Sequence, residues 1–168
     1  MADASIDSRA FRNTMGLFAT GVIVVTTQVG HQRRGVTANS FTSVSLHPPL
    51  LLICVDRNSS MLPLLEVADA FAVNILGADQ RSVSDTFARH GESEAVMMGV
   101  PFHDGELGSP ILEGVIGWAE CRVEERYAGG DHTILVGRVE SMAIERAGAD
   151  PLLYFSGGYR ALGGPIEA

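Results

Sequence analysis

Residues 118–142, WAECRVEERYAGGDHTILVGRVESM, contain two long predicted strands joined by a tight turn. Apolar and charged side chains alternate over residues 118–126, which is the pattern of a half-buried strand. A second strand is expected over residues 133–142, with Gly130 and Asp131 at its start. Long strands joined by glycine turns are typical of a closed or partly closed antiparallel barrel. On the first strand, we expect the inward face to hold Ala119, Cys121 and Val123 and the outward face to hold Glu120, Arg122 and Glu124.

The rest of the chain adds further strands and two or three short helices. One helix is expected between Ser8 as N-cap and Gly21, a second over 59–67, and a third from an Asp79 cap to near Arg89. The apolar run 50–55 is expected to be covered on both faces. The βαβ rhythm and the G-x-G-x-x-G motif of a Rossmann site are both missing from the sequence. The remaining strands are expected over 22–27, 33–38, 50–55, 70–76, 152–155 and 159–162.

Composition limits the possible functions. The chain has 168 residues, is 46% hydrophobic and carries a formal net charge of −8, and we expect one domain over residues 1–168. All twelve basic residues are arginine, so the chain has no lysine. This excludes a P-loop NTPase, pyridoxal phosphate bound as a lysine Schiff base, and a Ser-Lys nucleophile pair.

Charge and cysteine content indicate the setting. The arginines are dispersed in an acidic chain, so a nucleic-acid partner is not expected. Cys54 and Cys121 lie in apolar stretches, which predicts buried thiols in a reducing cytoplasm, and metal-ligand spacing is missing. The longest apolar run, 50–55, is far shorter than the roughly 20 residues of a membrane helix. We therefore expect a cytoplasmic protein without a metal.

Three polar clusters are candidate sites, and each has a structural alternative. Residues 35–50, GVTANSFTSVSLHPPL, are rich in hydroxyls that could surround an anion or the edge of a polar ring, or could form an ordinary loop. Residues 56–60, DRNSS, lead into the second helix, where free N–H groups and Arg57 would favour a phosphate. Helix capping by Asn58 or Ser59 is the alternative there. His132, after two glycines and Asp131, either points into a cleft or belongs to a surface turn.

The order and spacing of these clusters resemble one known family. From about residue 11 to residue 162 the chain is similar to the short-chain flavin reductases, which have the FMN-binding split-barrel fold and supply reduced flavin to two-component monooxygenases. The matching segments are Phe11-Arg12, residues 18–22, TANSFTSVSL with Pro48-Pro49-Leu50, residues 56–60, FAVNIL at 71–76, Phe87-Ala88, Gly130-Asp131-His132 with Gly137, and Tyr154. Met61 departs from the pattern, because many relatives have a small hydroxyl residue there.

The resemblance implies a mainly β fold, a split antiparallel barrel, and roles for individual residues. His132 would contact the nicotinamide. Arg57 and Arg89 are the candidates for the flavin phosphate, since the chain has no lysine. The residues expected to bind flavin are Thr37, Ala38, Asn39, Ser40, Ser43, Val44, Ser45, Asp56, Arg57, Ser59, Ser60, Phe87, Ala88, Arg89 and Tyr154.

The implied reaction is hydride transfer from NADH or NADPH to FMN or FAD, with the protein positioning the reactants. A homodimer and a partner monooxygenase that receives reduced flavin by diffusion are also implied. Two alternatives stay open: a non-catalytic flavin- or haem-binding split-barrel protein, and a pyridoxamine phosphate oxidase-like enzyme. The Gly130-Asp131-His132 segment argues against the first, and residues 37–46 argue against the second.

Overall fold

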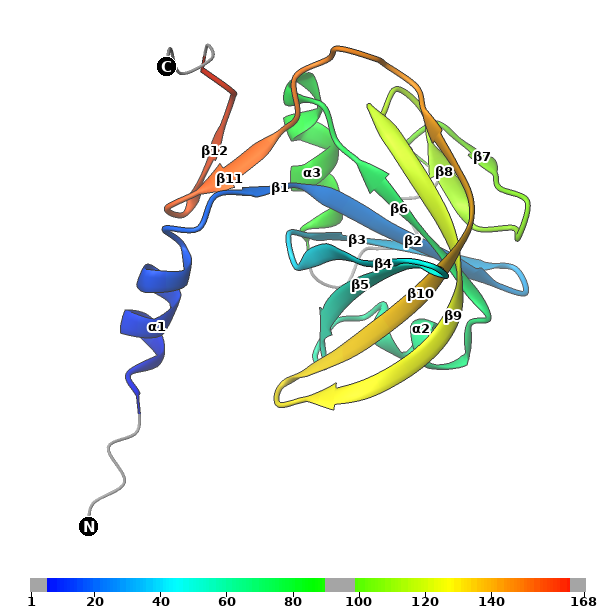
Figure 1. Ribbon diagram of the computed structural model, residues 1–168, viewed down its shortest axis with the longest axis horizontal. Coiled ribbons are helices and arrows are strands. Elements are labelled where there is room, and N and C mark those ends of the chain that lie inside the picture. Colours follow the sequence, from blue (N-terminus) through cyan, green and yellow to red (C-terminus); the bar gives the residue numbers. More distant parts are fainter. Residues whose placement is uncertain (1–5, 90–98, 164–168) are drawn as a thin grey trace.

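Seven antiparallel strands form one strongly curved sheet in the computed structural model, which describes residues 6–89 and 99–163 (Figure 1). The edge strands β3 and β4 follow each other in the chain and are joined through Asn39 and Ser40, yet they do not pair. The sheet therefore curls into a barrel that stays open along one side, which confirms the expected split antiparallel barrel. The order across the sheet is β3 (Gln32–Ala38), β2 (Ile23–Val29), β6 (Ala70–Ile75), β9 (Gly117–Gly129), β10 (His132–Ile144), β5 (Pro49–Asp56) and β4 (Phe41–Leu46).

Smaller elements surround the barrel. Strands β1 (Thr20–Gly21), β11 (Leu153–Phe155) and β12 (Gly158–Arg160) form a three-stranded sheet, and β7 (Phe102–Asp104) pairs with β8 (Pro110–Leu112). Helix α2 (Leu62–Val67) contacts β2, and α3 (Arg81–Phe87), preceded by the 3-10 turn η1 (Ala78–Gln80), contacts β3. Helix α1 (Ser8–Met15) projects away from the barrel, and none of its residues is buried (Figure 1).

Two apolar clusters hold the barrel together. Alternate residues of the strands point inward because the side-chain period of a strand is two. Gly137 permits the closest approach inside the barrel, since a Cβ there would lie 2.6 Å from the Phe71 ring. The inner cluster includes Ile23, Val25, Leu51, Ile53, Met61, Leu65, Phe71, Cys121 and Leu135. The outer cluster, under α3 and β8, includes Val22, Val24, Leu76, Phe87, Leu112, Val115 and Leu152.

Glu120 corrects the predicted outward face of β9. Its side chain is fully buried, and its carboxylate accepts hydrogen bonds from the backbone N–H groups of Leu107 and Ser109, at 2.9 and 2.8 Å. The β7–β8 hairpin covers this face of the sheet and supplies both donors. The alternation was predicted correctly, but both faces of the strand are covered here.

Other boundaries also differ from the expectations. Asp7 caps the first helix, since its carboxylate accepts from the Ala10 N–H at 2.9 Å, and the helix ends at Met15 and not near Gly21. The third helix, α3, begins at Arg81 after the 3-10 turn and ends at Phe87, and Asp79 binds Arg146 instead of capping it. Strand β5 is fully buried on one face only, and its other face, with Cys54, is half-buried. Strands β1, β4, β7 and β8 were not predicted.

No helix within residues 6–89 and 99–163 is long and apolar enough to cross a membrane.

Candidate functional site

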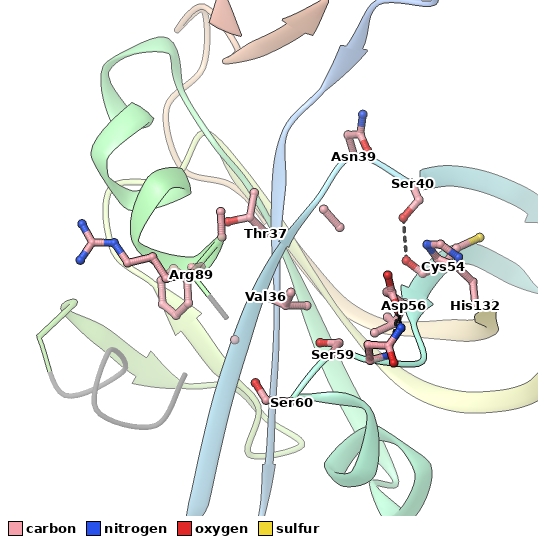
Figure 2. A pocket seen from close by; sticks show the side chains of 16 residues that line it. Val36, Thr37, Asn39, Ser40, Cys54, Asp56, Ser59, Ser60, Arg89 and His132 are labelled. Atoms are coloured by element: carbon pink, nitrogen blue, oxygen red, sulfur yellow. Dashed lines mark hydrogen bonds between the residues drawn. The ribbon is translucent and has the colours of Figure 1, made fainter. Parts of the chain in front are cut away.

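A pocket of about 250 Å³ opens along the split side of the barrel (Figure 2). One wall is the outer edge of β3, a second is the end of β5 with the turn that follows it, and a third is the C-terminal end of α3. Its lining residues are Gly35, Val36, Thr37, Ala38, Asn39, Ser40, Cys54, Val55, Asp56, Asn58, Ser59, Ser60, Phe87, Ala88, Arg89 and His132.

Hydrogen bonds from β3 and the segment after it hold the upper walls in place. The Ser40 hydroxyl donates to the Cys54 carbonyl at 2.7 Å, and the Cys54 N–H donates to the Ser40 carbonyl at 3.1 Å (Figure 2). The Thr37 hydroxyl donates to the Ser84 carbonyl of α3 at 2.7 Å. Each hydroxyl oxygen keeps its lone pairs for a ligand, because a hydroxyl both donates and accepts.

The turn after β5 is fixed by its own side chains. The Asp56 carboxylate accepts from the Asn58 N–H at 2.7 Å, and the Ser59 hydroxyl accepts from the Met61 N–H at 3.3 Å. Helix α2 begins at Leu62, three residues later than predicted, so Ser59 and Ser60 lie before it and not in its first turn. Met61 is fully buried in the barrel interior and cannot replace the hydroxyl residue of the family pattern.

His132 lies at the opposite wall from Arg89, next to Cys54 and Asp56 (Figure 2). Its Nδ1 is 2.8 Å from the Asp131 carboxylate. This hydrogen bond from His132 is the main reason that the pKa of Asp131 lies below its usual range. The backbone is held as well, because the Arg57 N–H donates to the Asp131 carbonyl at 2.9 Å.

A second cavity of about 260 Å³ adjoins the pocket and shares four lining residues with it. Tyr154 and Tyr159 form its far wall, with their rings edge to face at 5.6 Å. The Tyr159 hydroxyl lies 2.8 Å from the Ser84 hydroxyl, and burial raises the pKa of Tyr159. The shared residues are Thr37, Ala38, Asn39 and Ala88.

Most predicted site residues line the pocket, and five do not. Ser43, Val44 and Ser45 lie on β4, away from the pocket, and Tyr154 lines only the adjoining cavity. Arg57 does not line it either, although Arg89 does. The predicted residues that do line it are Thr37, Ala38, Asn39, Ser40, Asp56, Ser59, Ser60, Phe87, Ala88, Arg89 and His132.

Seven lining residues were not assigned individually: Gly35, Val36, Cys54, Val55 and Asn58 in the first pocket, and Val22 and Tyr159 in the second. Gly35, Val36 and Asn58 lie within the predicted polar clusters, whereas Cys54 and Val55 were expected only in an apolar strand. Gly35 has a clear reason to be there, because a Cβ at this position would lie 2.6 Å from the Phe87 ring. A glycine two residues before Thr37 could therefore have indicated that another side chain packs closely against the backbone there.

The pocket suits a planar, polar-edged ring that carries a phosphate. Val36, Val55 and Phe87 supply apolar surface for the faces of a ring, while Thr37 and Asn39 supply polar atoms for its edge. Ser59 supplies a hydroxyl and Arg89, after the end of α3, supplies a positive charge for a phosphate. Among the described residues, no group of three His, Cys, Asp or Glu side chains could hold a metal ion.

Comparison with known proteins identifies this arrangement. The model of the flavin reductase like domain matches residues 15–163. The chain belongs to the flavin reductase family. It is 39% identical over 153 residues to the reductase component of 4-hydroxyphenylacetate 3-monooxygenase from Thermus thermophilus, covering 91% of this chain and 95% of that protein.

Two further relatives agree with this family. A probable flavin reductase of Rhizobium meliloti is 44% identical over 91% of this chain, which spans only 48% of that longer protein. The structure of the NADH:FAD oxidoreductase SgcE6 from Streptomyces globisporus, with NAD and FAD fragments, is 38% identical, covers 96% of both chains and has a TM-score of 0.88.

The family decides among the three functions that the sequence left open. The protein is an NAD(P)H-dependent flavin reductase, so flavin and a nicotinamide nucleotide are its reactants. The non-catalytic and the pyridoxamine phosphate oxidase-like alternatives are therefore set aside.

Proposed function

We propose that this flavin reductase holds FMN or FAD in the split between β3 and β5 and reduces it there with NADH or NADPH. The observation that supports this proposal is the composition of the pocket. It brings together apolar side chains for the faces of the flavin ring, polar atoms for the edge of the ring, and Arg89, and His132 lines the same cleft. Bound flavin supplies the hydride acceptor, and the reduced nicotinamide supplies the hydride.

The residues of the chain bind and orient the reactants. Thr37, Asn39 and Ser40 hold the ring edge, while Val36 and Phe87 exclude water from the ring faces. Ser59, Ser60 and Arg89 hold the phosphate. His132 orients the nicotinamide against the ring, so that the reacting atoms start close together. A side-chain nucleophile is not needed for this reaction.

The reduced flavin leaves the pocket and reaches a partner monooxygenase by diffusion. Relatives named as reductase components of monooxygenases support this role. The pocket lies along the open side of the barrel, which leaves a path by which the product can depart.

We also propose that the protein is a homodimer. Helix α1 has eight residues and none is buried, although Phe11 and Met15 are apolar, and a helix this short is marginal in water without packing. An apolar groove of about 710 Å³, defined here by Phe41, Ile75, Trp118, Met142 and Ile144, is likewise uncovered, with Ile144 80% exposed. In a dimer with a two-fold axis, each subunit presents its α1 and its apolar groove to the other. One interface can therefore cover both surfaces of both subunits.

The test of the reaction is a flavin-dependent oxidation assay. Purified protein is given FMN or FAD with NADH or NADPH, and loss of reduced-nicotinamide absorbance is followed for all four combinations. We expect rapid oxidation with at least one combination, and none when flavin is omitted. Lack of flavin-dependent oxidation with either nucleotide would contradict the proposal.

His132→Ala tests the assigned role of the histidine. We expect a raised KM for the nucleotide and an unchanged Kd for flavin, measured by flavin fluorescence. An equal loss of flavin binding would show that His132 belongs to the flavin site instead.

A further inference from the structure

Ser84 is a fully buried residue of α3 that lies behind the wall shared by the two cavities, and it lines neither of them. Its carbonyl accepts hydrogen bonds from the Thr37 hydroxyl at 2.7 Å and from the Ala88 N–H at 3.0 Å. Both lone pairs of this carbonyl are therefore used. Thr37 and Ala88 each line both cavities, so the backbone of Ser84 is fixed directly to the shared wall.

The Ser84 hydroxyl extends this connection to the C-terminal hairpin. It lies 2.8 Å from the hydroxyl of Tyr159, which is on β12 and 75 residues away along the chain. The ring of Tyr159 forms part of the far wall of the second cavity. Ser84 thus links three elements that surround the cavities, namely β3, the C-terminal end of α3, and β12.

Three contacts hold the Tyr159 ring in one orientation. Ser84 binds its hydroxyl, and the Tyr154 ring packs edge to face against it, with the ring centres 5.6 Å apart. The Arg81 guanidinium lies over the ring, 5.3 Å from its centre. Aromatic pairs and cation–π contacts both depend on orientation, so together with the hydrogen bond they make this ring a fixed apolar wall.

We infer that Ser84 is a positioning residue that fixes Tyr159 as an aromatic wall of the flavin site, against which the flavin ring packs from the second cavity. The inference rests on the proposed function, in which Thr37 and Asn39 hold the edge of the ring. Both of these residues line both cavities, so a ring in contact with them borders the second cavity as well. Tyr159 is then a binding residue, and Ser84 acts through it.

The test removes each hydroxyl of the pair in turn. We expect Ser84→Ala and Tyr159→Phe to raise the Kd for riboflavin and for FMN by the same factor, roughly 3- to 10-fold, as for the loss of one net hydrogen bond. The factors should be equal because the wall contacts the ring and not the phosphate. Ser82→Ala, exposed on the same helix, and Tyr127→Phe, 53% exposed on β9, are the matched controls and should leave both Kd values unchanged.

Fluorescence titration of each flavin measures the Kd values, at a temperature where thermal melting shows every variant to be folded. A variant that melts earlier but binds both flavins normally would overturn the inference, because a purely structural hydrogen bond acts in that way. A loss confined to FMN would overturn it too, since the effect would then lie at the phosphate.

A double variant shows whether Ser84 acts through Tyr159. Ser84→Ala combined with Tyr159→Phe should bind flavin no more weakly than the more affected single variant. Additive losses would overturn the inference. Unmodified protein that binds neither flavin would instead overturn the proposed function, so the two failures are distinct.

Discussion

Ser40 and Cys54 tie the end of the β3 segment to β5 through a pair of hydrogen bonds, at 2.7 and 3.1 Å. Ser40 connects β3 to the other edge strand, β4, and its pairing with Cys54 continues the ladder between β4 and β5. Past this point β3 and β5 do not pair, and the pocket occupies the space between them. The same contact thus holds the chain where it crosses from one edge strand to the other, at the upper end of the site.

Ser40→Ala removes the donor to the Cys54 carbonyl. We expect the free energy of unfolding to fall by about 1 kcal/mol, because a half-buried carbonyl loses its partner. Flavin affinity should fall as well, since the pocket wall is then held to β5 by the backbone hydrogen bond alone. Ser43→Ala is the control, as Ser43 is exposed on β4 and does not line the pocket. Denaturant unfolding and fluorescence titration measure the two effects, and equal losses in both variants would contradict this prediction.

Gly35→Ala forces a methyl group to within 2.6 Å of the Phe87 ring. The ring must move, so we expect destabilisation of about 1–3 kcal/mol and weaker flavin binding. Gly21→Ala is the control, because a Cβ there meets nothing within 4 Å. Thermal melts of both variants, with and without FMN, check the difference.

Arg89→Ala tests the phosphate end of the pocket. We expect FMN binding to weaken about 10-fold, as for the loss of a partly exposed charged hydrogen bond. Riboflavin, which has no phosphate, should bind the variant and the unmodified protein equally. Arg57→Ala is the matched control, since Arg57 does not line the pocket and FMN affinity should be kept. A greater loss in Arg57→Ala than in Arg89→Ala would reverse the assignment.

The buried thiol of Cys121 makes stability depend on alkaline pH. Burial, with smaller effects of Glu120 and Glu140, raises the pKa of Cys121 to about 12. Above the ordinary thiol pKa of about 8.5 the unfolded chain releases this proton while the folded protein keeps it. The unfolded state then binds fewer protons, so the free energy of unfolding falls as pH rises toward 12.

Cys121→Ala should make this decline shallower, by at most about 1.4 kcal/mol per pH unit. Urea unfolding at a series of pH values between about 8 and 11 measures the slope, in the range set by the ordinary thiol pKa and the raised one. Cys54→Ala, which removes the half-buried thiol, is expected to keep most of the slope. Identical slopes in Cys121→Ala and the unmodified protein would rule the explanation out.

Ile144→Glu tests the homodimer. A carboxylate in the apolar groove cannot be covered by a second copy without losing its hydration, so we expect monomers. Val67→Glu is the control, because Val67 is also exposed, at 66%, but lies on α2 outside the groove. Light scattering after size exclusion measures the mass, and a dimeric Ile144→Glu variant would place the interface elsewhere.

Local patterns predicted most of the barrel. The alternation over residues 118–126 lies in β9, because a buried face leaves a period of two in the sequence. The β-branched run at 22–27 lies in β2 except for Val22, and the strand predicted at 133–142 lies in β10. The short strand β4 was missed because its residues, FTSVSL, are mostly exposed in the chain and carry no apolar face.

The candidate site was predicted in pieces. The polar residues at 37–40, the turn at 56–60 apart from Arg57, and His132 were found from residue type and spacing, and they line one pocket. Cys54 and Val55 were assigned only to an apolar strand, since nothing local indicates that the end of β5 faces a gap. Ser43, Val44 and Ser45 have the same polar character as Thr37, yet a strand edge takes them away from the pocket.

The sequence by itself determined most of the longer strands and the polar clusters that could line a site, since both depend on near neighbours along the chain. Only the tertiary structure decided what covers each face. Glu120 is buried because the β7–β8 hairpin folds over it, and Gly35 approaches Phe87 because α3 returns to β3. Such contacts join residues that are far apart in the chain, so they produce no local pattern of residue types from which they could be predicted.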